Sequence, residues 1–167
     1  MDVGACDNFA IRCGVSTCSS ECIRYLIECG ADIHADNDYP IKSAVYHSTL
    51  ANFEILLQYG ANINVNNGYL LKLCANGYLL NLGTHKIMKI LLEVGVNVHS
   101  LSKEDLLKII QTGSISIIKL LVEYGVDFSV VNDVKLDESN DTDILIDILV
   151  EIGVDLKQVA RILYHKN

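Results

Sequence analysis

The chain has 167 residues, of which 50% are hydrophobic and 20% are charged, so it carries enough apolar material for a folded interior. Its net charge of −8, from 13 basic and 21 acidic residues, argues against nucleic acids and anionic membranes as partners, because clustered Lys and Arg bind such partners. No apolar stretch matches a bilayer span and no secretory signal precedes the first helix, so we expect an intracellular, cytoplasmic protein.

A glycine recurs behind the same helical signature at five places. The five glycines, which we expect to end helices in the left-handed conformation, are Gly30, Gly60, Gly95, Gly125 and Gly153. Apolar residues stand seven, four and three positions before each of them, as Phe53, Leu56 and Leu57 do before Gly60. These offsets fall on one face of a helix. The period, close to 30 residues in most intervals, is typical of a stacked-repeat solenoid.

The predicted elements follow one order in each unit: a short helix, a loop, a longer helix that ends at the glycine, and a turn. The short helices are expected at residues 9–14, 39–44, 69–74 and 102–110. Hydroxyl-bearing residues precede the longer helices and are predicted to cap them; they are Ser19, Thr49, Thr84, Ser114 and Thr142. Pro40 is tolerated in a first helical turn, and the residues 66–68, Asn-Asn-Gly, indicate a tight turn.

Two units depart from this pattern. The third is longer by five residues, which we place at Tyr78–Leu82; this insertion is either a loop, often on a binding face, or an extension of the short helix. In the fifth, residues 134–141 carry too few apolar side chains to bury a helical face. An apolar stripe returns at residues 156–163 and indicates a C-terminal capping helix.

The first unit opens inside the repeat motif, with no polar helix before it. We expect its apolar side chains Phe9, Ile11, Ile23 and Ile27 to form an uncapped end face. Such a face either joins the chain to a longer array or is covered by a partner.

Six cysteines invite a metal or redox interpretation, since five of them lie in the first 29 residues. None forms a C-x-x-C pair and no histidine stands among these five, so we interpret them as small hydrophobic residues in helix contacts. His34 and His99 share a repeat position but lie two units apart. No phosphate loop, nucleophile elbow or acid–base pair is present. The sequence predicts no metal, no cofactor and no enzymatic activity.

The pattern resembles the ankyrin repeat. The family's Thr-Pro-Leu-His-x-Ala corresponds to residues 39–44, Tyr-Pro-Ile-Lys-Ser-Ala, and its Leu-Leu-x-x-Gly-Ala-Asp/Asn-Ile to residues 56–63. Short units rich in Ile, Asn and Lys are most similar to the ankyrin proteins of giant DNA viruses. The resemblance implies one all-α solenoid of stacked helix-turn-helix units, joined by short turns or hairpins, over residues 1–167. The units are placed at 1–35, 36–65, 66–100, 101–130 and 131–155, with the capping helix at 156–165.

The resemblance also implies a non-enzymatic protein–protein interaction module that holds another protein in a concave groove, in the host cytoplasm if the chain is viral. The matching groove positions are Asp38, Tyr46 and His47 in the second unit, Gly68, Asn76 and Gly77 in the third, and Gln111 and Thr112 in the fourth. Tyr46 is the strongest candidate anchor, because tyrosine offers a large contact area at little entropic cost. Two alternatives stay open: a structural piece that self-associates through its uncapped ends, and a cysteine- or metal-dependent activity in the N-terminal cluster.

Overall fold

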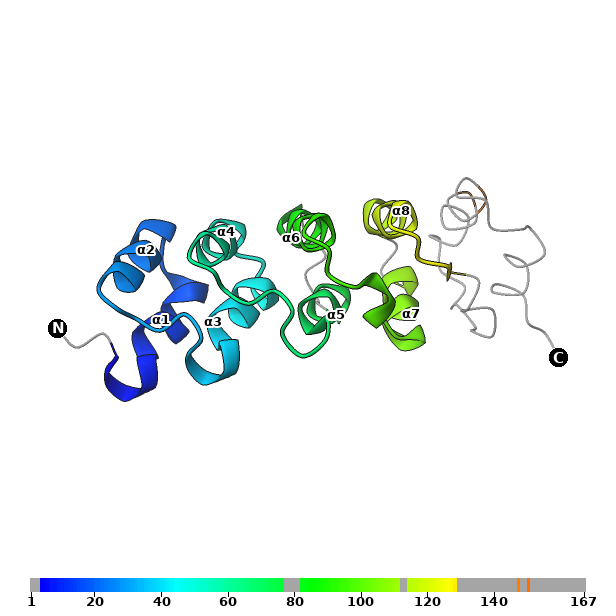
Figure 1. The fold of residues 1–167 in the computed structure, drawn as a ribbon. Helices are drawn as coiled ribbons and strands as arrows, with labels where there is room; N and C mark the ends of the chain where they lie inside the picture. Colours follow the sequence, from blue (N-terminus) through cyan, green and yellow to red (C-terminus); the bar gives the residue numbers. More distant parts are fainter. Residues whose placement is uncertain (1–3, 77–81, 112–113, 129–146, 148–149, 151–167) are drawn as a thin grey trace. The chain divides into compact units, whose positions relative to one another are not determined.

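The computed structural model describes residues 4–76, 82–111 and 114–128, together with residues 147 and 150. The chain divides into two compact units, residues 1–97 and 98–167. All the regular elements in the described ranges are helices, which confirms the predicted all-α class (Figure 1). The boundaries placed at 35, 65, 100 and 130 within a single domain stay a prediction.

The first unit contains three helix pairs arranged in two layers. The helices are α1 (Ala5–Thr17), α2 (Ser20–Glu28), α3 (Ala35–Tyr46), α4 (Leu50–Gln58), α5 (Tyr69–Asn76) and α6 (Leu82–Glu93). Helix α3 contacts both α1 and α5, and α4 contacts both α2 and α6. Each odd-numbered helix also contacts the even-numbered helix that follows it. We call α1, α3 and α5 the first layer and α2, α4 and α6 the second layer (Figure 1).

The second unit begins with a short 3-10 helix, η1 (Val98–Ser100), followed by α7 (Lys103–Gln111) and α8 (Ile115–Glu123), which contact each other. A reciprocal cap fixes the start of α7. Ser102 donates to Asp105 Oδ2 from its backbone N–H (2.9 Å) and its hydroxyl (2.8 Å), and the Asp105 N–H donates to Ser102 Oγ (3.2 Å). The predicted helix start at Ser102 is therefore confirmed.

A left-handed residue precedes the regular part of each first-layer helix. Asn8, Asp38 and Gly68 have φ values of 56°, 61° and 81°. The regular helices consequently begin at Phe9, Tyr39 and Tyr69, as the sequence predicts. Asn, Asp and Gly are the residues that adopt this conformation most readily, so this position of the repeat selects for them.

The repeat glycines behave as predicted. The described members have φ values of +93°, +87°, +86° and +84° at Gly30, Gly60, Gly95 and Gly125, and Gly153 lies outside the described residues. At the end of α4, the N–H of Gly60 donates to Leu57 O and the N–H of Ala61 donates to Leu56 O. These two bonds satisfy carbonyls that the helix end would otherwise leave without partners.

In the helices that end at the repeat glycines, the buried face is formed mainly by two of the three predicted positions, those seven and four residues before the glycine. Seven positions before the glycine, Ile23, Phe53, Met88 and Ile118 are fully buried. Three positions before it, only Leu92 is buried, whereas Leu57 is half-buried and Val150 is 40% exposed. The position three residues before the glycine therefore lies at the edge of the buried face. Its assignment to the core is wrong for Val150.

The predicted caps are only partly correct. Ser19 caps α2 by accepting from the Cys22 N–H at 3.5 Å. Thr49 and Ser114 stand at helix starts without a capping bond. Thr84 lies inside α6, because this helix already begins at Leu82, and its hydroxyl bonds Ser48 Oγ at 2.6 Å. Thr142 lies outside the described residues, as do Tyr78–Asn81 of the insertion and the predicted capping helix at 156–165.

Asn52 in α4 connects the second helix pair to the first through hydrogen bonds of its side chain. Its side chain is 4% exposed, and Nδ2 donates to Val15 O at 2.8 Å and to Cys18 O at 3.1 Å, at the end of α1. The amide thus satisfies a buried carbonyl of Val15 and a partly buried carbonyl of Cys18 at a helix terminus, where the helix itself provides no donors.

The expected apolar end face is wrong for its central residues. Ile11 and Ile23 are fully buried, Ile27 is half-buried, and of the four expected side chains only Phe9 is largely exposed, at 60%. Ile23 packs on the first helix, since its Cδ1 lies 3.3 Å from the position that a Cβ of Gly14 would take.

The interpretation of the N-terminal cysteines as buried hydrophobic residues is also wrong where it can be checked. Cys13, Cys18 and Cys29 are exposed, and Cys22 is half-buried. The buried positions of the first pair are occupied by Ile11, Val15 and Ile23 instead. Among the cysteines whose side chains the structure describes, only Cys74, in α5, has the predicted buried environment.

Candidate protein-binding surface of the first layer

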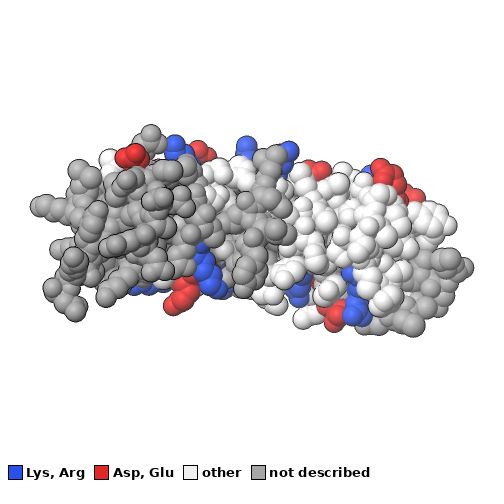
Figure 2. All heavy atoms as spheres, turned by 180° about the vertical axis from the view of Figure 1, so that it is seen from behind, with Lys and Arg blue, Asp and Glu red and all other residues white. Residues whose placement is uncertain are grey.

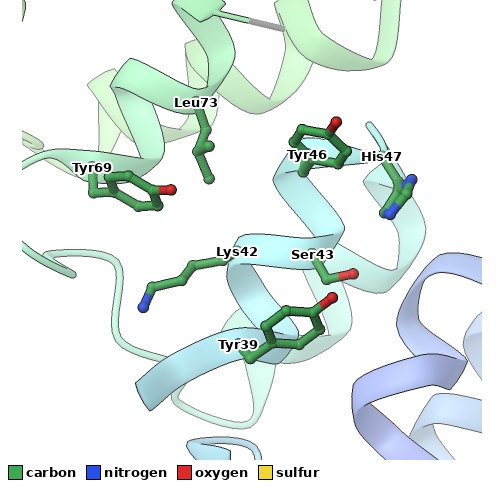
Figure 3. A pocket seen from close by; sticks show the side chains of 7 residues that line it. All are labelled: Tyr39, Lys42, Ser43, Tyr46, His47, Tyr69 and Leu73. Atoms are coloured by element: carbon green, nitrogen blue, oxygen red, sulfur yellow. The ribbon is translucent and has the colours of Figure 1, made fainter. Parts of the chain in front are cut away.

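Two of the predicted groove residues line a pocket on the first layer. Tyr46 is the last residue of α3 and His47 follows it. The pocket has a volume of about 250 Å³ and lies between α3 and α5 (Figure 3). Its lining comprises Tyr39, Lys42, Ser43, Tyr46, His47, Tyr69 and Leu73.

The other predicted positions do not join this pocket. Asp38 Oδ1 lies 2.6 Å from His34 Nδ1, and its side chain is 17% exposed. Gly68 is buried in the turn before α5, where its φ is left-handed, so it offers little surface for a contact. Asn76 and Gln111 end α5 and α7, and Gly77 and Thr112 lie outside the described residues.

Three partly exposed tyrosines line the pocket. Tyr39, Tyr46 and Tyr69 are 42%, 56% and 39% exposed. The ring of Tyr46 meets that of His47 edge-on, with the ring centroids 5.0 Å apart and an interplanar angle of 85°. Such an arrangement is favourable for aromatic rings and holds both side chains in place.

Cationic side chains reach from one helix of the layer to the aromatic ring of the next. The Arg12 guanidinium lies 5.6 Å from the centroid of Tyr39, and Lys42 Nζ lies 5.8 Å from the centroid of Tyr69. These distances are in the range of cation–π attraction. We call Arg12, Tyr39, Lys42 and Tyr69 the cation–aromatic ladder.

The left-handed turn at the start of α3 holds this ladder at its base. Asp36 and Asn37 both have left-handed φ values, of 52° and 62°. The Asp36 carboxylate forms an ion pair with Arg12 at 3.1 Å, and the Asn37 carbonyl accepts a hydrogen bond from Lys42 Nζ. The turn geometry thus sets the direction of both cations.

A repeated pair of residue types could have revealed the ladder from the sequence. Phe9 and Arg12, Tyr39 and Lys42, and Tyr69 and Lys72 are each three residues apart at the same place in the repeat. Residues three apart share one helical face. The aromatic residue and the cation replace the Thr and His of the family motif, and this double replacement was the signal that the sequence analysis missed.

Charge is distributed without a large field of one sign on the face seen in Figure 2. The described Lys, Arg, Asp and Glu side chains visible there form small separate groups of both signs. This distribution differs from the continuous basic stripe typical of proteins that bind nucleic acids.

The structure gives little support to a cysteine- or metal-dependent activity. Within the described ranges, no three His, Cys, Asp or Glu side chains are placed to hold a metal ion. A hydrogen bond with Cys18, together with burial, raises the pKa of the Cys22 thiol, and burial raises the pKa of Cys74 to about 12. Both shifts disfavour the thiolate, which is the reactive form. No helix in the described part is long and apolar enough to cross a bilayer.

The chain is similar to proteins of Acanthamoeba polyphaga mimivirus that are named as ankyrin repeat proteins. It is 29% identical to R598 over 165 residues and 26% identical to R601 over 213 aligned positions. These alignments cover 84% and 96% of the chain. A third protein of the same kind, R602, is 39% identical over 51 residues. No family model matches the chain.

The helix pairs and the left-handed glycines agree with the ankyrin-type fold that the repeat pattern predicts, and the chain is similar to ankyrin repeat proteins of a giant virus. It spans 53% of the length of R598 and 70% of that of R601.

Proposed function

We propose that the chain is a non-enzymatic interaction scaffold that holds a partner protein on the first layer of its N-terminal unit. The observation that carries this proposal is the pocket between α3 and α5, where Tyr39, Tyr46 and Tyr69 stay 39–56% exposed. Ankyrin repeats generally bind other proteins, which supports a role in protein binding.

Exposed tyrosines around one pocket are typical of the residues that contribute most of the binding energy in a protein interface. Full burial of an aromatic side chain stabilises a complex by about 1.5–3 kcal/mol, and partial burial by less. Tyrosine is enriched at such positions because it covers a large area and loses little conformational freedom. Tyr46 combines the highest exposure of the three with a fixed neighbour in His47.

The test compares capture of partners by the wild-type chain and by two matched variants. Tyr46→Ala removes the central ring of the pocket, whereas Tyr25→Ala removes an equally exposed tyrosine of α2, in the second layer. We expect a protein captured from the native cell type to be lost with Tyr46→Ala and kept with Tyr25→Ala. Equal capture by all three chains would contradict binding at this pocket.

Self-association is a second candidate, because Phe9 and Tyr25 are 60% and 63% exposed on the first helix pair. Since Ile11 and Ile23 are buried, these two rings are the most exposed apolar side chains that the structure describes on this helix pair. A double variant, Phe9→Ser with Tyr25→Ser, should lower the sedimentation coefficient at high protein concentration if the chain self-associates. A wild-type chain that sediments as a monomer at every concentration would remove this candidate.

We place the scaffold in the cytoplasm, of a host cell if the chain is viral. The exposed thiols of Cys13, Cys18 and Cys29 suit a compartment that keeps cysteines reduced. Fluorescence microscopy of the tagged chain in the native cell type tests this location, and accumulation in a secretory compartment would contradict it.

A further inference from the structure

We propose that the pocket receives the carboxylate of an Asp or Glu side chain from an extended acidic segment of the partner, with aliphatic neighbours lying on the tyrosine rings. This inference rests on the proposed scaffold function and adds the chemistry of the partner.

The polar groups that line the pocket can all donate hydrogen bonds. They are the ammonium of Lys42, the hydroxyls of Ser43, Tyr39, Tyr46 and Tyr69, and the ring N–H of His47. No carboxylate is among the seven lining residues. A group that only accepts hydrogen bonds therefore matches the pocket better than a donor does, and a carboxylate is the strongest such group among the natural side chains.

The first layer is less acidic than the chain as a whole. The chain carries a net charge of −8. Helices α1, α3 and α5, by contrast, contain three basic residues, Arg12, Lys42 and Lys72, and three acidic residues, Asp7, Asp36 and Asp38, so this layer carries no net formal charge. An acidic segment is thus repelled less by this layer than by the chain as a whole, and Lys42 attracts it locally, which favours docking at the pocket.

The nearest acidic side chains do not occupy the position of the incoming carboxylate. Asp36 is paired with Arg12 at 3.1 Å, and Asp38 is bonded to His34 at 2.6 Å. Both lie in the left-handed turn at the start of α3, and neither lines the pocket.

Lys42 is held ready for an anionic ligand. Its side chain runs toward the ring of Tyr69 (Figure 3), where Nζ lies 5.8 Å from the ring centroid and donates to the Asn37 carbonyl. An ammonium has three hydrogens, so donors remain beyond that bond. Because the side chain is already ordered, a bound carboxylate gains a charge-assisted bond at a reduced entropic cost.

The size of the pocket sets the size of the ligand. A volume of about 250 Å³ holds one or two side chains, and it is below the usual range for a drug-sized molecule. The flanking rings offer flat apolar surface for the residues beside the acid. We therefore expect an anchor in a peptide segment, and a single strand of nucleic acid is the competing occupant because its bases also stack on aromatic rings.

A random peptide library of about twelve residues, displayed on phage and selected on the full chain, tests the inference. We expect the enriched peptides to share an Asp or Glu beside an aliphatic residue. Replacing that acid by its amide in a synthetic peptide should weaken binding to the wild-type chain on the order of tenfold, in keeping with a partly exposed charge-assisted bond. The same replacement should have a much smaller effect on binding to Lys42→Gln.

Two variants of the chain serve as controls. Tyr46→Ala should weaken every selected peptide, while Lys89→Gln, which removes an exposed lysine of α6, should weaken none. Circular dichroism melting curves establish that each variant folds. If Lys42→Gln does not fold, Tyr39→Leu replaces it as the second pocket variant. This substitution removes one hydrogen-bond donor and keeps an apolar side chain.

The outcomes separate the two proposals. Peptides that lose binding with Tyr46→Ala but show no acidic preference would overturn the acidic ligand and leave the scaffold function intact. No selected peptide, or peptides indifferent to both pocket variants, would overturn both proposals. An oligothymidine of about twelve nucleotides that displaces the peptides and depends on Lys42 would show that the anionic partner is a nucleic acid.

Discussion

Asn52→Asp is the sharpest single test of how the first two helix pairs are joined. The substitution exchanges an amide nitrogen for an oxygen and keeps the shape of the side chain. In the folded chain that nitrogen donates to Val15 O at 2.8 Å and to Cys18 O at 3.1 Å. An ionised carboxylate cannot donate, so it would face two carbonyl oxygens inside the protein. The other side-chain oxygen is buried without a hydrogen-bond partner, so it gives the new charge no compensation.

The expected loss of stability has an upper bound set by protonation. Keeping the new carboxyl neutral at about pH 7 costs about 4 kcal/mol, given a reference pKa of about 3.9 and about 1.36 kcal/mol per pH unit. A neutral carboxyl donates one hydrogen bond where the amide donates two, which costs about 1 kcal/mol more. We therefore expect a loss of about 3–5 kcal/mol at neutral pH, a large share of the stability of a typical domain.

The sign of the pH dependence follows from the same argument. Burial beside carbonyl oxygens raises the pKa of the introduced carboxyl above its unfolded value, so the folded variant binds a proton more tightly than the unfolded chain does. The deficit relative to the wild type should shrink as the pH falls, to about 1–1.5 kcal/mol near pH 4, where protonation itself costs only about 0.5 kcal/mol.

Urea unfolding followed by circular dichroism at both pH values measures this deficit, and Asn62→Asp is the matched control. Asn62 is exposed, and its Oδ1 accepts from the Asn64 N–H at 3.0 Å, which a carboxylate can do equally well. Asp32 already makes the equivalent bond to the His34 N–H. The control should stay within about 0.5 kcal/mol of the wild type. Equal effects of the two substitutions, or a deficit that ignores pH, would refute the reasoning.

Three further predictions concern a glycine, a cysteine and a helix cap. Gly60→Val should cost about 1–2 kcal/mol from backbone strain alone, because no atom lies within 4 Å of a Cβ at that site; a melting curve equal to that of Gln58→Ala would contradict this. Cys74 should resist a thiol reagent at about pH 8 in the folded chain while the exposed Cys13, Cys18 and Cys29 react, and four fast-reacting thiols including Cys74 would be the opposing result. Asp105→Ala should lower the free energy of unfolding by about 1 kcal/mol or more through loss of the cap with Ser102, and Asp105→Asn by less; an unchanged midpoint in urea would speak against the cap.

The features that could be predicted from the sequence are those that one repeat determines by itself. The left-handed φ of Gly60 and the burial of Phe53 follow from helix periodicity and from the conformational freedom of glycine. The regular part of α3 begins at Tyr39 because Pro40, the next residue, is favoured in a first helical turn and because a turn precedes Tyr39. None of these needs knowledge of the neighbouring unit.

The errors arise where a side chain bonds to a different repeat. Thr49 stands where a cap is expected, but its hydroxyl donates to Val15 O, 34 residues away in sequence, and to Ala44 O. Thr84 bonds Ser48 across 36 residues. The sequence of one repeat predicts that both hydroxyls accept a hydrogen bond from the backbone of their own helix. In the folded chain, the stacking of the repeats supplies partners that are distant in sequence.

The same distinction explains why the candidate site was only half identified. Tyr46 and His47 were assigned through the family resemblance, repeat by repeat. Lys42 and Tyr69 belong to different units, and their contact depends on the way α3 stacks on α5. The degenerate motif of one unit therefore does not indicate the contact between Lys42 and Tyr69. The recurrence of aromatic and basic residues three positions apart does indicate it.

That recurrence also determines what the ladder can do for a partner. Each cation leans on the aromatic ring of the next helix, Arg12 on Tyr39 and Lys42 on Tyr69, so every contact joins neighbours only. In a repeat protein, energetic coupling of this kind is passed between adjacent units and is not shared globally. A change at Arg12 should therefore alter the orientation of Tyr39 and leave Tyr69 in place. The ladder consequently presents a series of separately adjustable anchors, which suits recognition of an extended segment better than recognition of one compact ligand.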